Sequence, residues 1–158
     1  MDVDGTPLRK TYIKLPTFSA MATRSRIGLE LKNGSVLSVY HHWDGYPEWL
    51  GRILTSHYNT RQQVAELIDG GDMSCCWTEI AYYGESTGQE YGPEYYSQRG
   101  EDCPPRHDAD LCEYLLPDNS EEYAYVFRSG EWVCYNMHQF DDTKLPEVVE
   151  IPTGALAV

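Results

Sequence analysis

Apolar and polar positions alternate in two stretches of the chain, and each stretch predicts a β-hairpin. In the first, Ile27, Leu29 and Leu31 alternate with smaller or polar residues. Asn33-Gly34, the strongest two-residue turn signal, comes next, and the apolar pattern returns from Val36 to Tyr40. The spacing therefore predicts an antiparallel pair of strands between Arg26 and His41.

A two-residue loop also predicts the register of this hairpin. It places Leu29 opposite Ser38 on the face that we expect to form the core, and Arg26 opposite His41 on the other face. Arg26 and His41 should then lie side by side, next to the turn at Trp43-Asp44.

The second hairpin is predicted between Tyr123 and Met137, with a turn at Ser129-Gly130. A two-residue loop here pairs Phe127 with Trp132. Both faces of this hairpin are largely apolar or aromatic. We therefore expect them to be covered, either within the chain or by a second subunit.

Between the two hairpins, apolar residues recur at spacings of three and four, which is typical of helices. A helix is predicted from Pro47, with a buried face made of Leu50, Ile53, Leu54 and Tyr58. Thr60 to Gln63 has the form of a capping box, which opens a short helix that Gly70-Gly71 ends. Residues 109–116 suit a third short helix with Asp108 as its N-cap.

These elements predict a single α+β domain, with two antiparallel hairpins forming a sheet and two or three short helices. We place the domain at residues 21–140, between an N-terminal extension at 1–20 and a C-terminal tail at 141–158. Gly84 to Pro93 lacks periodicity and is predicted to be an exposed loop.

The chain is acidic, with a formal net charge of −13, and the charge is unevenly distributed. Residues 1–60 contain 7 Lys and Arg against 5 Asp and Glu, whereas residues 61–158 contain 5 against 20. This excludes binding to nucleic acid or to an anionic membrane through bulk charge. No run of 18 apolar residues and no signal-peptide order occur, so we expect no membrane contact and a cytoplasmic location.

Candidates for metal binding and catalysis are weak. Five cysteines without a C-x-x-C pair favour reduced, packed thiols over disulfides or a zinc module. Cys103 and His107 lie four apart but lack further ligands at a suitable spacing, so we expect no metal and no cofactor.

The chain has no nucleophile elbow, Gly-rich phosphate loop or H-E-x-x-H. We expect a protein that is not an enzyme, although His42 or His57 could act as a general base.

Two groups of residues suit an anionic ligand with a flat ring. One surrounds the turn before Pro47 and the other lies around three arginines of the acidic half. Arginines bind phosphate through two hydrogen bonds, aromatic faces stack on bases, and a helix N-terminus adds positive charge. The alternative is that the arginines pair with carboxylates, His41 packs and Asp44 caps the helix. The candidate ligand-binding residues are Arg24, Arg26, His41, Trp43, Asp44, Tyr46, Tyr96, Arg99, Arg106, Phe127 and Arg128.

Residues 21–137 resemble a family of small bacteriophage proteins. The most specific segment is Tyr40-His41-His42-Trp43-Asp44-Gly45-Tyr46-Pro47. The other matching segments are Thr23-Arg24-Ser25-Arg26-Ile27-Gly28, the Asn-Gly hairpin, Gly51, Asp69-Gly70-Gly71-Asp72, Arg99-Gly100-Glu101-Asp102, and Tyr123-Ala124-Tyr125-Val126-Phe127 with Gly130-Glu131-Trp132.

This family is similar to the phage anti-Thoeris sponge proteins, which bind a cyclic ADP-ribose signal made by bacterial TIR-domain enzymes and hold it without cleaving it. Some relatives hold cyclic oligonucleotides instead. The resemblance implies a small α+β homo-oligomer, a dimer or higher, with pockets near subunit interfaces where arginine and aromatic residues grip the ligand. The chain departs from the family pattern in residues 1–20, in Gly84 to Pro93, and in His41 where the family has a cysteine.

We therefore expect a phage anti-defence protein that sequesters a nucleotide second messenger in the host cytoplasm. The messenger would be of the cyclic ADP-ribose type or a cyclic oligonucleotide. Two alternatives stay open: an acidic inhibitor of a host defence or nucleic-acid-processing protein, and an enzyme that cleaves the same nucleotides.

Overall fold

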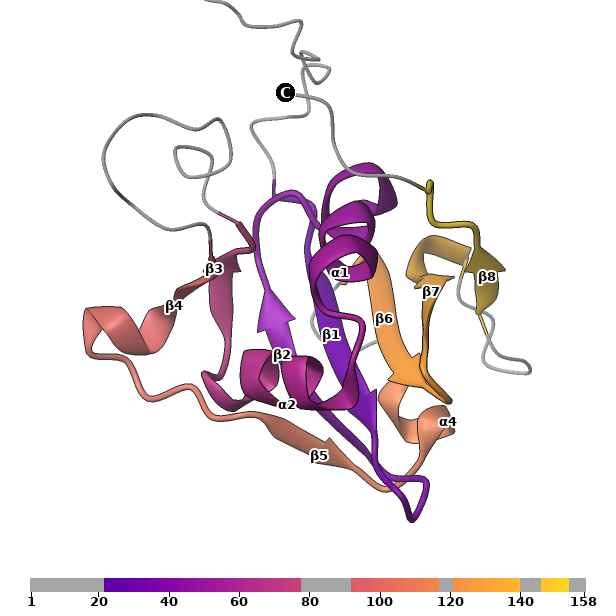
Figure 1. Ribbon diagram of the computed structural model, residues 1–158, viewed down its shortest axis with the longest axis horizontal. Coiled ribbons are helices and arrows are strands. Elements are labelled where there is room, and N and C mark those ends of the chain that lie inside the picture. The colour runs from indigo at the N-terminus through magenta and orange to yellow at the C-terminus, as the bar shows by residue number, and fades with distance from the viewer. Residues whose placement is uncertain (1–21, 78–91, 117–120, 140–145, 154–158) are drawn as a thin grey trace, which may run out of the picture.

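One mixed β-sheet organises the chain (Figure 1). The computed structural model describes residues 22–77, 92–116, 121–139 and 146–153. The sheet has eight strands in the order β4-β3-β2-β1-β6-β7-β8, and β5 pairs with β2. The strands are β1 Ser25–Glu30, β2 Val36–His41, β3 Met73–Cys75, β4 Glu94–Tyr95, β5 Arg106–Asp108, β6 Tyr123–Arg128, β7 Glu131–Asn136 and β8 Glu147–Val149.

The predicted α+β fold is confirmed. β1 and β2 form one antiparallel hairpin, β6 and β7 form the other, and β1 pairs in parallel with β6 to join them into one sheet. The second hairpin has the predicted register, with Phe127 opposite Trp132. Ser129 and Gly130 both have positive φ angles, 52° and 80°, which suits a two-residue turn.

The predicted register of the first hairpin is wrong by one residue. Ser25, and not Arg26, lies opposite His41, because the loop holds three residues. The amide of Leu31 donates to the Ser35 carbonyl at 2.8 Å, and Gly34, with φ +88°, supplies the left-handed residue of a bulged turn. Asn33 Oδ1 accepts hydrogen bonds from the Ser35 amide at 3.0 Å and its hydroxyl at 2.6 Å, which stabilises this loop.

The helices begin and end close to their predicted positions. A π-helical turn, Pro47–Gly51, leads into α1 at Arg52–His57. α2 spans Arg61–Asp69 and has the predicted capping box between Thr60 and Gln63. α4 spans Leu111–Tyr114, and its N-cap is Asp110 rather than the predicted Asp108. Single 3-10 turns lie at Tyr96–Arg99 and Met137–Gln139.

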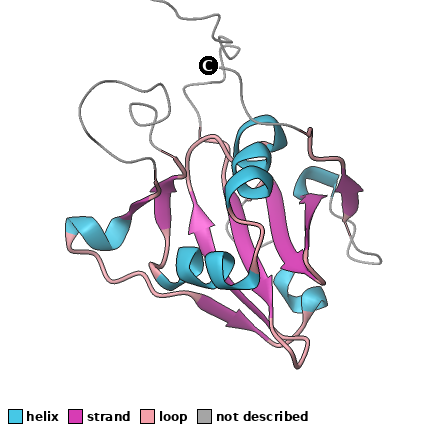
Figure 2. Cartoon of the chain, viewed as in Figure 1, coloured by secondary structure: helices cyan, strands magenta, loops and turns pink. Residues whose placement is uncertain are grey.

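Both faces of the sheet are covered in part (Figure 2). On one, here called the helix face, the apolar sides of α1 and α2 pack on Ile27, Val39 and Tyr125. On the opposite face, here called the far face, Tyr114 and the residue after it pack on Val36, Val126 and their neighbours. The second hairpin is therefore sandwiched within the chain, as one of its two predicted arrangements requires.

Parts of the two chain ends and of the long insertion are not among the residues that the structure describes. Residues 1–20 and residues 84–91 of the predicted loop lie outside the described residues. The sequence predicted a tail from residue 141, whereas residues 147–149 form β8 and pair with β7. Ile151 then lies against Gly51, so this segment helps to cover the start of the α1 region.

Candidate functional site

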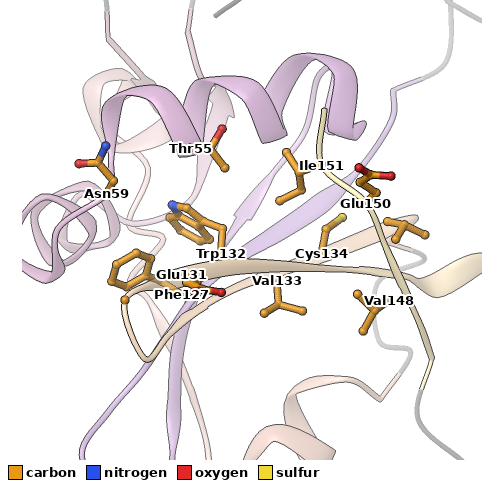
Figure 3. A pocket seen from close by; sticks show the side chains of 12 residues that line it. Thr55, Asn59, Phe127, Glu131, Trp132, Val133, Cys134, Val148, Glu150 and Ile151 are labelled. Atoms are coloured by element: carbon orange, nitrogen blue, oxygen red, sulfur yellow. The ribbon is translucent and has the colours of Figure 1, made fainter. Parts of the chain in front are cut away.

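A groove of about 450 Å³ opens on the helix face, between α1, the β6–β7 turn and β8 (Figure 3). Of the predicted ligand-binding residues, Phe127 lines this groove. Its buried ring packs against Trp132 with ring centroids 5.3 Å apart. The Phe127 side chain thus belongs to the core on the helix face, whereas the neighbouring Arg128 points to the opposite face of the sheet.

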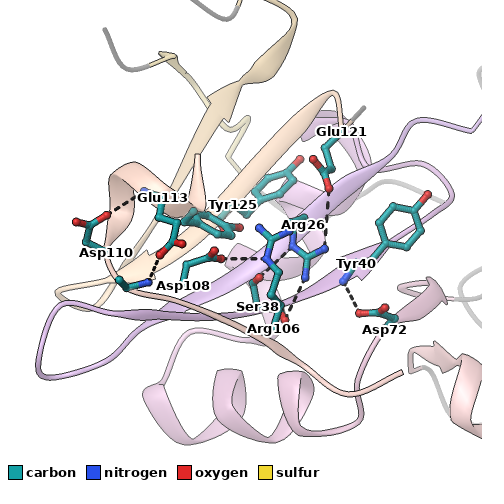
Figure 4. Close-up of polar contacts among 12 residues, drawn as sticks. Arg26, Ser38, Tyr40, Asp72, Arg106, Asp108, Asp110, Glu113, Glu121 and Tyr125 are labelled. Carbon is teal, nitrogen blue, oxygen red and sulfur yellow. Dashed lines mark hydrogen bonds and ion pairs between the residues drawn. The ribbon is translucent and has the colours of Figure 1, made fainter. Parts of the chain in front are cut away.

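Arg26 is a buried structural residue on the far face (Figure 4). Its Nε donates to Ser38 Oγ at 3.0 Å, its Nη2 donates to the Ser38 carbonyl at 3.3 Å, and its Nη1 lies 3.9 Å from a carboxylate oxygen of Glu121. Burial lowers the pKa of Arg26, and the nearby Arg106 lowers it further. These contacts hold the Arg26 guanidinium inside the fold.

Three other predicted arginines pair with carboxylates in the way that the alternative reading described. Arg106 lies 3.0 Å from Asp108 within β5, and Arg128 lies 3.3 Å from Glu30 on β1. Arg99 lies 3.1 Å from Glu94, but both side chains of this pair are exposed. Exposed ion pairs are weak, so a phosphate could compete with Glu94 for Arg99.

His41 lies on the helix face, and its predicted position beside Arg26 is wrong. Neighbouring residues of a strand point to opposite faces, so the one-residue change in register separates the two side chains. His41 is fully buried, its Nδ1 lies 3.2 Å from Ser25 Oγ, and burial lowers its pKa to about 3. A ligand at the surface has no access to this ring.

Four predicted residues lie around the end of β2, together with Tyr40 and His42, which were not predicted to bind the ligand. We call this group the edge cluster: Arg24, Tyr40, His42, Trp43, Tyr96 and Arg99. The Tyr40 hydroxyl lies 2.7 Å from His42 Nδ1, and the His42 ring meets Trp43 edge to face at 4.7 Å. Arg24 lies close enough to the Tyr40 phenol to lower its pKa. Arg99 lies over the Tyr96 ring, 5.3 Å from its centroid.

Asp72 connects the two halves of the edge cluster. Its Oδ1 accepts a hydrogen bond from the Tyr40 amide at 2.8 Å, and its carbonyl accepts one from the Tyr96 amide at 3.1 Å. Gly71, with φ +88°, precedes Asp72 and turns the chain from α2 into β3. Asp72 and Tyr40 were missed as site residues, although both lie in segments that carry the family resemblance.

The turn before Pro47 shapes one side of the edge cluster. Asp44 has a φ of 60°, and the Gly45 amide donates to the Thr23 carbonyl at 2.9 Å. Tyr46, and not Asp44, is the N-cap residue of the helix, and its side chain makes no capping hydrogen bond. The turn leaves Trp43 with 40% of its surface exposed.

The edge cluster takes its positive charge from its two arginines. Burial lowers the pKa of His42, and Arg24 lowers it further, so the imidazole is neutral at neutral pH. Burial raises the pKa of the Tyr40 phenol, an effect that Arg24 opposes. Nearby, burial and Glu94 raise the pKa of the Cys75 thiol to about 12, which keeps it protonated and a poor nucleophile.

The described ranges, with their gaps, contain no group of three or more His, Cys, Asp or Glu that could hold a metal ion. None of the helices in those ranges is both long enough and apolar enough to cross a membrane.

Searches with protein-family models, curated proteins and solved structures gave no match to this chain. Chemical interpretation of the site therefore rests on the side chains of the edge cluster.

Proposed function

We propose that the chain binds a small nucleotide-type ligand at the edge cluster and holds it without cleaving it. The observation that carries this proposal is the placement of Trp43, Tyr96 and two arginines around one end of β2. An arginine can donate two parallel hydrogen bonds to a phosphate, and an exposed ring can stack on a base. The cluster thus offers both contacts that a nucleotide needs.

The family resemblance narrows the ligand to a cyclic ADP-ribose type or a cyclic oligonucleotide. In this proposal the chain is a phage anti-defence protein that lowers the concentration of free messenger in the host cytoplasm. Sequestration needs tight binding and slow release but no chemical step. The protonated Cys75 thiol supports binding over nucleophilic attack.

The proposal also includes a homo-oligomer, because the resemblance implies pockets near subunit interfaces. The edge cluster lies at the β3–β4 side of the sheet, where a second copy could cover the bound ligand (Figure 1). Light scattering on the purified chain, with and without ligand, measures the mass directly. A monomer under both conditions would remove the oligomer from the proposal and leave the binding claim in place.

The binding claim is tested by incubating the purified chain with cyclic ADP-ribose isomers and with cyclic oligonucleotides. After the free ligand is removed, the protein is heat-denatured and the released material is identified by mass spectrometry. We expect at least one ligand to be recovered intact. Recovery of a cleaved product would favour the enzyme alternative, and no retained ligand in any sample would sink the proposal.

Variants locate the site. We expect Arg24→Gln and Trp43→Ala each to weaken binding by about tenfold or more, which corresponds to roughly 1.4 kcal/mol. Arg61→Gln is the matched control, because Arg61 lies exposed on α2 and donates to the Glu30 carbonyl at 3.1 Å. Equal weakening by Arg61→Gln would place the ligand elsewhere.

A further inference from the structure

Strand β7 extends further than the part of it that β8 covers. β7 has six residues, and β8 pairs with residues 134–136, which are the second half of β7. Past Val149 the chain leaves β7 and approaches Gly51. Among the described residues, no strand therefore continues the sheet beside residues 131–133. The groove lies at this position and is lined by residues 130–134, and we call residues 131–133 with this groove the open edge (Figure 3).

The backbone of Trp132 offers one hydrogen-bond donor and one acceptor at the open edge. In a hairpin with a two-residue loop, the residues that flank the loop, here Arg128 and Glu131, form a hydrogen-bonded pair. Because hydrogen-bonded and non-hydrogen-bonded pairs alternate, Phe127 and Trp132 form a non-hydrogen-bonded pair. The N–H and C=O of Trp132 therefore point away from β6 and toward the groove. An extended chain that lies beside β7 can bind both groups.

The side chains at the open edge differ between the two faces of the sheet. On the helix face, Trp132 and Ile151 contribute apolar surface to the groove (Figure 3). Val133 packs on the far face, and Glu131, two residues earlier in the same strand, points to that face as well. A strand added here would thus meet apolar side chains on one face and a carboxylate on the other.

The charge at the open edge is negative. Glu131 and Glu150 both line the groove and are exposed, and none of the lining residues is Lys or Arg. Arg128 lies opposite Glu131 in the register, but its guanidinium pairs with Glu30 at 3.3 Å. A second copy of the chain, with its net charge of −13, would bring further negative charge to this contact. Charge complementarity therefore favours a basic partner.

We propose that the open edge binds an extended segment of another protein, in which apolar residues alternate with Lys or Arg. The segment adds a strand beside residues 131–133 and forms hydrogen bonds with the Trp132 backbone. Because the side chains of a strand alternate between the two faces, its apolar side chains meet Trp132 and Ile151 while its basic ones meet Glu131. This contact is separate from the edge cluster, because β7 and β4 lie toward opposite ends of the sheet order.

A short fluorescent peptide of alternating lysine and valine residues tests the binding, by fluorescence anisotropy on the full chain. The same peptide with glutamate in place of lysine removes the charge match. A version with proline in place of its central valine keeps the charge but removes a backbone donor. We expect the lysine-valine peptide to bind about fivefold or more tightly than either. No binding, or equal binding of the proline version, would overturn the proposal.

Amide hydrogen exchange followed by NMR locates the bound peptide. The peptide should slow exchange of the Trp132 amide and leave the Val133 amide, which faces β6, unchanged. Exchange at Trp132 that is already as slow as at Val133 in the chain alone would show that the position is filled. Independence from protein concentration would then identify the chain itself as the occupant, and dependence on it would identify a second copy. Either result would overturn the proposal, as would slowed exchange only elsewhere.

Charge variants test the basic character of the partner. Glu131→Gln with Glu150→Gln should weaken binding of the lysine-valine peptide by about fivefold or more. Glu66→Gln with Glu101→Gln is the matched control, because it removes the same charge from exposed positions outside the groove. The control should change binding by less than about twofold, since exposed charges at a distance are screened. Equal weakening by the two pairs would show that the peptide responds only to overall charge, and the proposal would be wrong.

Discussion

His41 Nδ1 lies 3.2 Å from Ser25 Oγ across the β1–β2 pair, and neither residue is exposed to solvent. The other ring nitrogen, Nε2, is buried and has no hydrogen-bond partner among the described residues. Transfer of a charged imidazolium into such a place is costly, and burial accordingly lowers the pKa of His41 to about 3. The fold therefore holds this ring in its neutral form.

The first prediction concerns acid stability. Because the pKa of His41 is near 3 in the folded chain and 6.5 for an unperturbed histidine, the unfolded chain binds a proton between pH 3 and pH 6.5 that the folded chain does not. The contribution of His41 to stability is thus full above pH 6.5 and is lost as the pH falls toward 3. Between these two pH values, His41 changes the free energy of unfolding by up to about 1.4 kcal/mol for each pH unit.

Urea denaturation of the wild type and of His41→Gln at several pH values measures this contribution. From pH 6.5 to 4.5 we expect the free energy of unfolding of the variant to fall by about 2 kcal/mol less than that of the wild type. His107→Gln, at an exposed position on β5, is the control and should follow the wild type. Parallel curves for wild type and His41→Gln would contradict the prediction.

The second prediction concerns the turn beside the edge cluster. A Cβ atom on Gly45 would lie 2.5 Å from Ser25 Oγ and 2.7 Å from the Thr23 carbonyl oxygen. Gly45→Ala should therefore lower the free energy of unfolding by about 1–3 kcal/mol, as overpacking does elsewhere. Gly92→Ala, where a Cβ atom would meet nothing within 4 Å, should change it by less than about 0.5 kcal/mol. Chemical denaturation of both variants gives the comparison, and equal effects would argue against the close contact.

The third prediction separates a buried ion pair from an exposed one. Arg26→Leu removes one ion-pair partner of Glu121, whose side chain is 3% exposed, together with two hydrogen bonds to Ser38, and should lower the free energy of unfolding by about 3–5 kcal/mol. Arg128→Leu removes the partner of Glu30 near the surface and should lower it by less than about 1 kcal/mol. Thermal and urea unfolding of the two variants provide the measurement. A larger effect at Arg128 would reverse the assignment of Arg26 as the structural arginine.

The fourth prediction concerns the start of α2. Thr60 Oγ1 accepts a hydrogen bond from the Gln63 amide at 3.2 Å, and Gln63 Oε1 accepts one from the Thr60 amide at 3.1 Å. Thr60→Ala should lower the free energy of unfolding by about 1 kcal/mol, since a cap hydrogen bond is lost. Thr153→Ala, at an exposed position, should change it by less than about 0.5 kcal/mol. Urea unfolding that finds equal stability for Thr60→Ala and the wild type would show that the cap contributes nothing.

Local signals predicted much of the fold. The spacing of Leu50, Ile53 and Leu54 gave the buried side of the first helix, and Thr60 with Gln63 gave the start of the next one. The second hairpin also has its predicted register. In each case the deciding interactions lie within a few residues along the chain, so the pattern itself contains them.

The sequence could not decide between two loops for the first hairpin. Asn33-Gly34 fits both a two-residue turn and a three-residue turn with a left-handed glycine. The Asn33 side chain accepts hydrogen bonds from Ser35 and favours the longer loop, which moves every residue of β2 by one position relative to β1. This one-residue change in register placed the His41 side chain in the core and separated it from Arg26.

The sequence by itself determined the α+β class, the second hairpin, the positions of the helices and the types of side chain available for a ligand. Only the tertiary structure decided which of these side chains meet. Arg26 and Arg106 pair with carboxylates on the far face, whereas Arg24, Trp43, Tyr96 and Arg99 gather at the edge cluster. The physical reason is that strand pairing and register bring together residues distant in the chain, and these depend on contacts across the whole sheet.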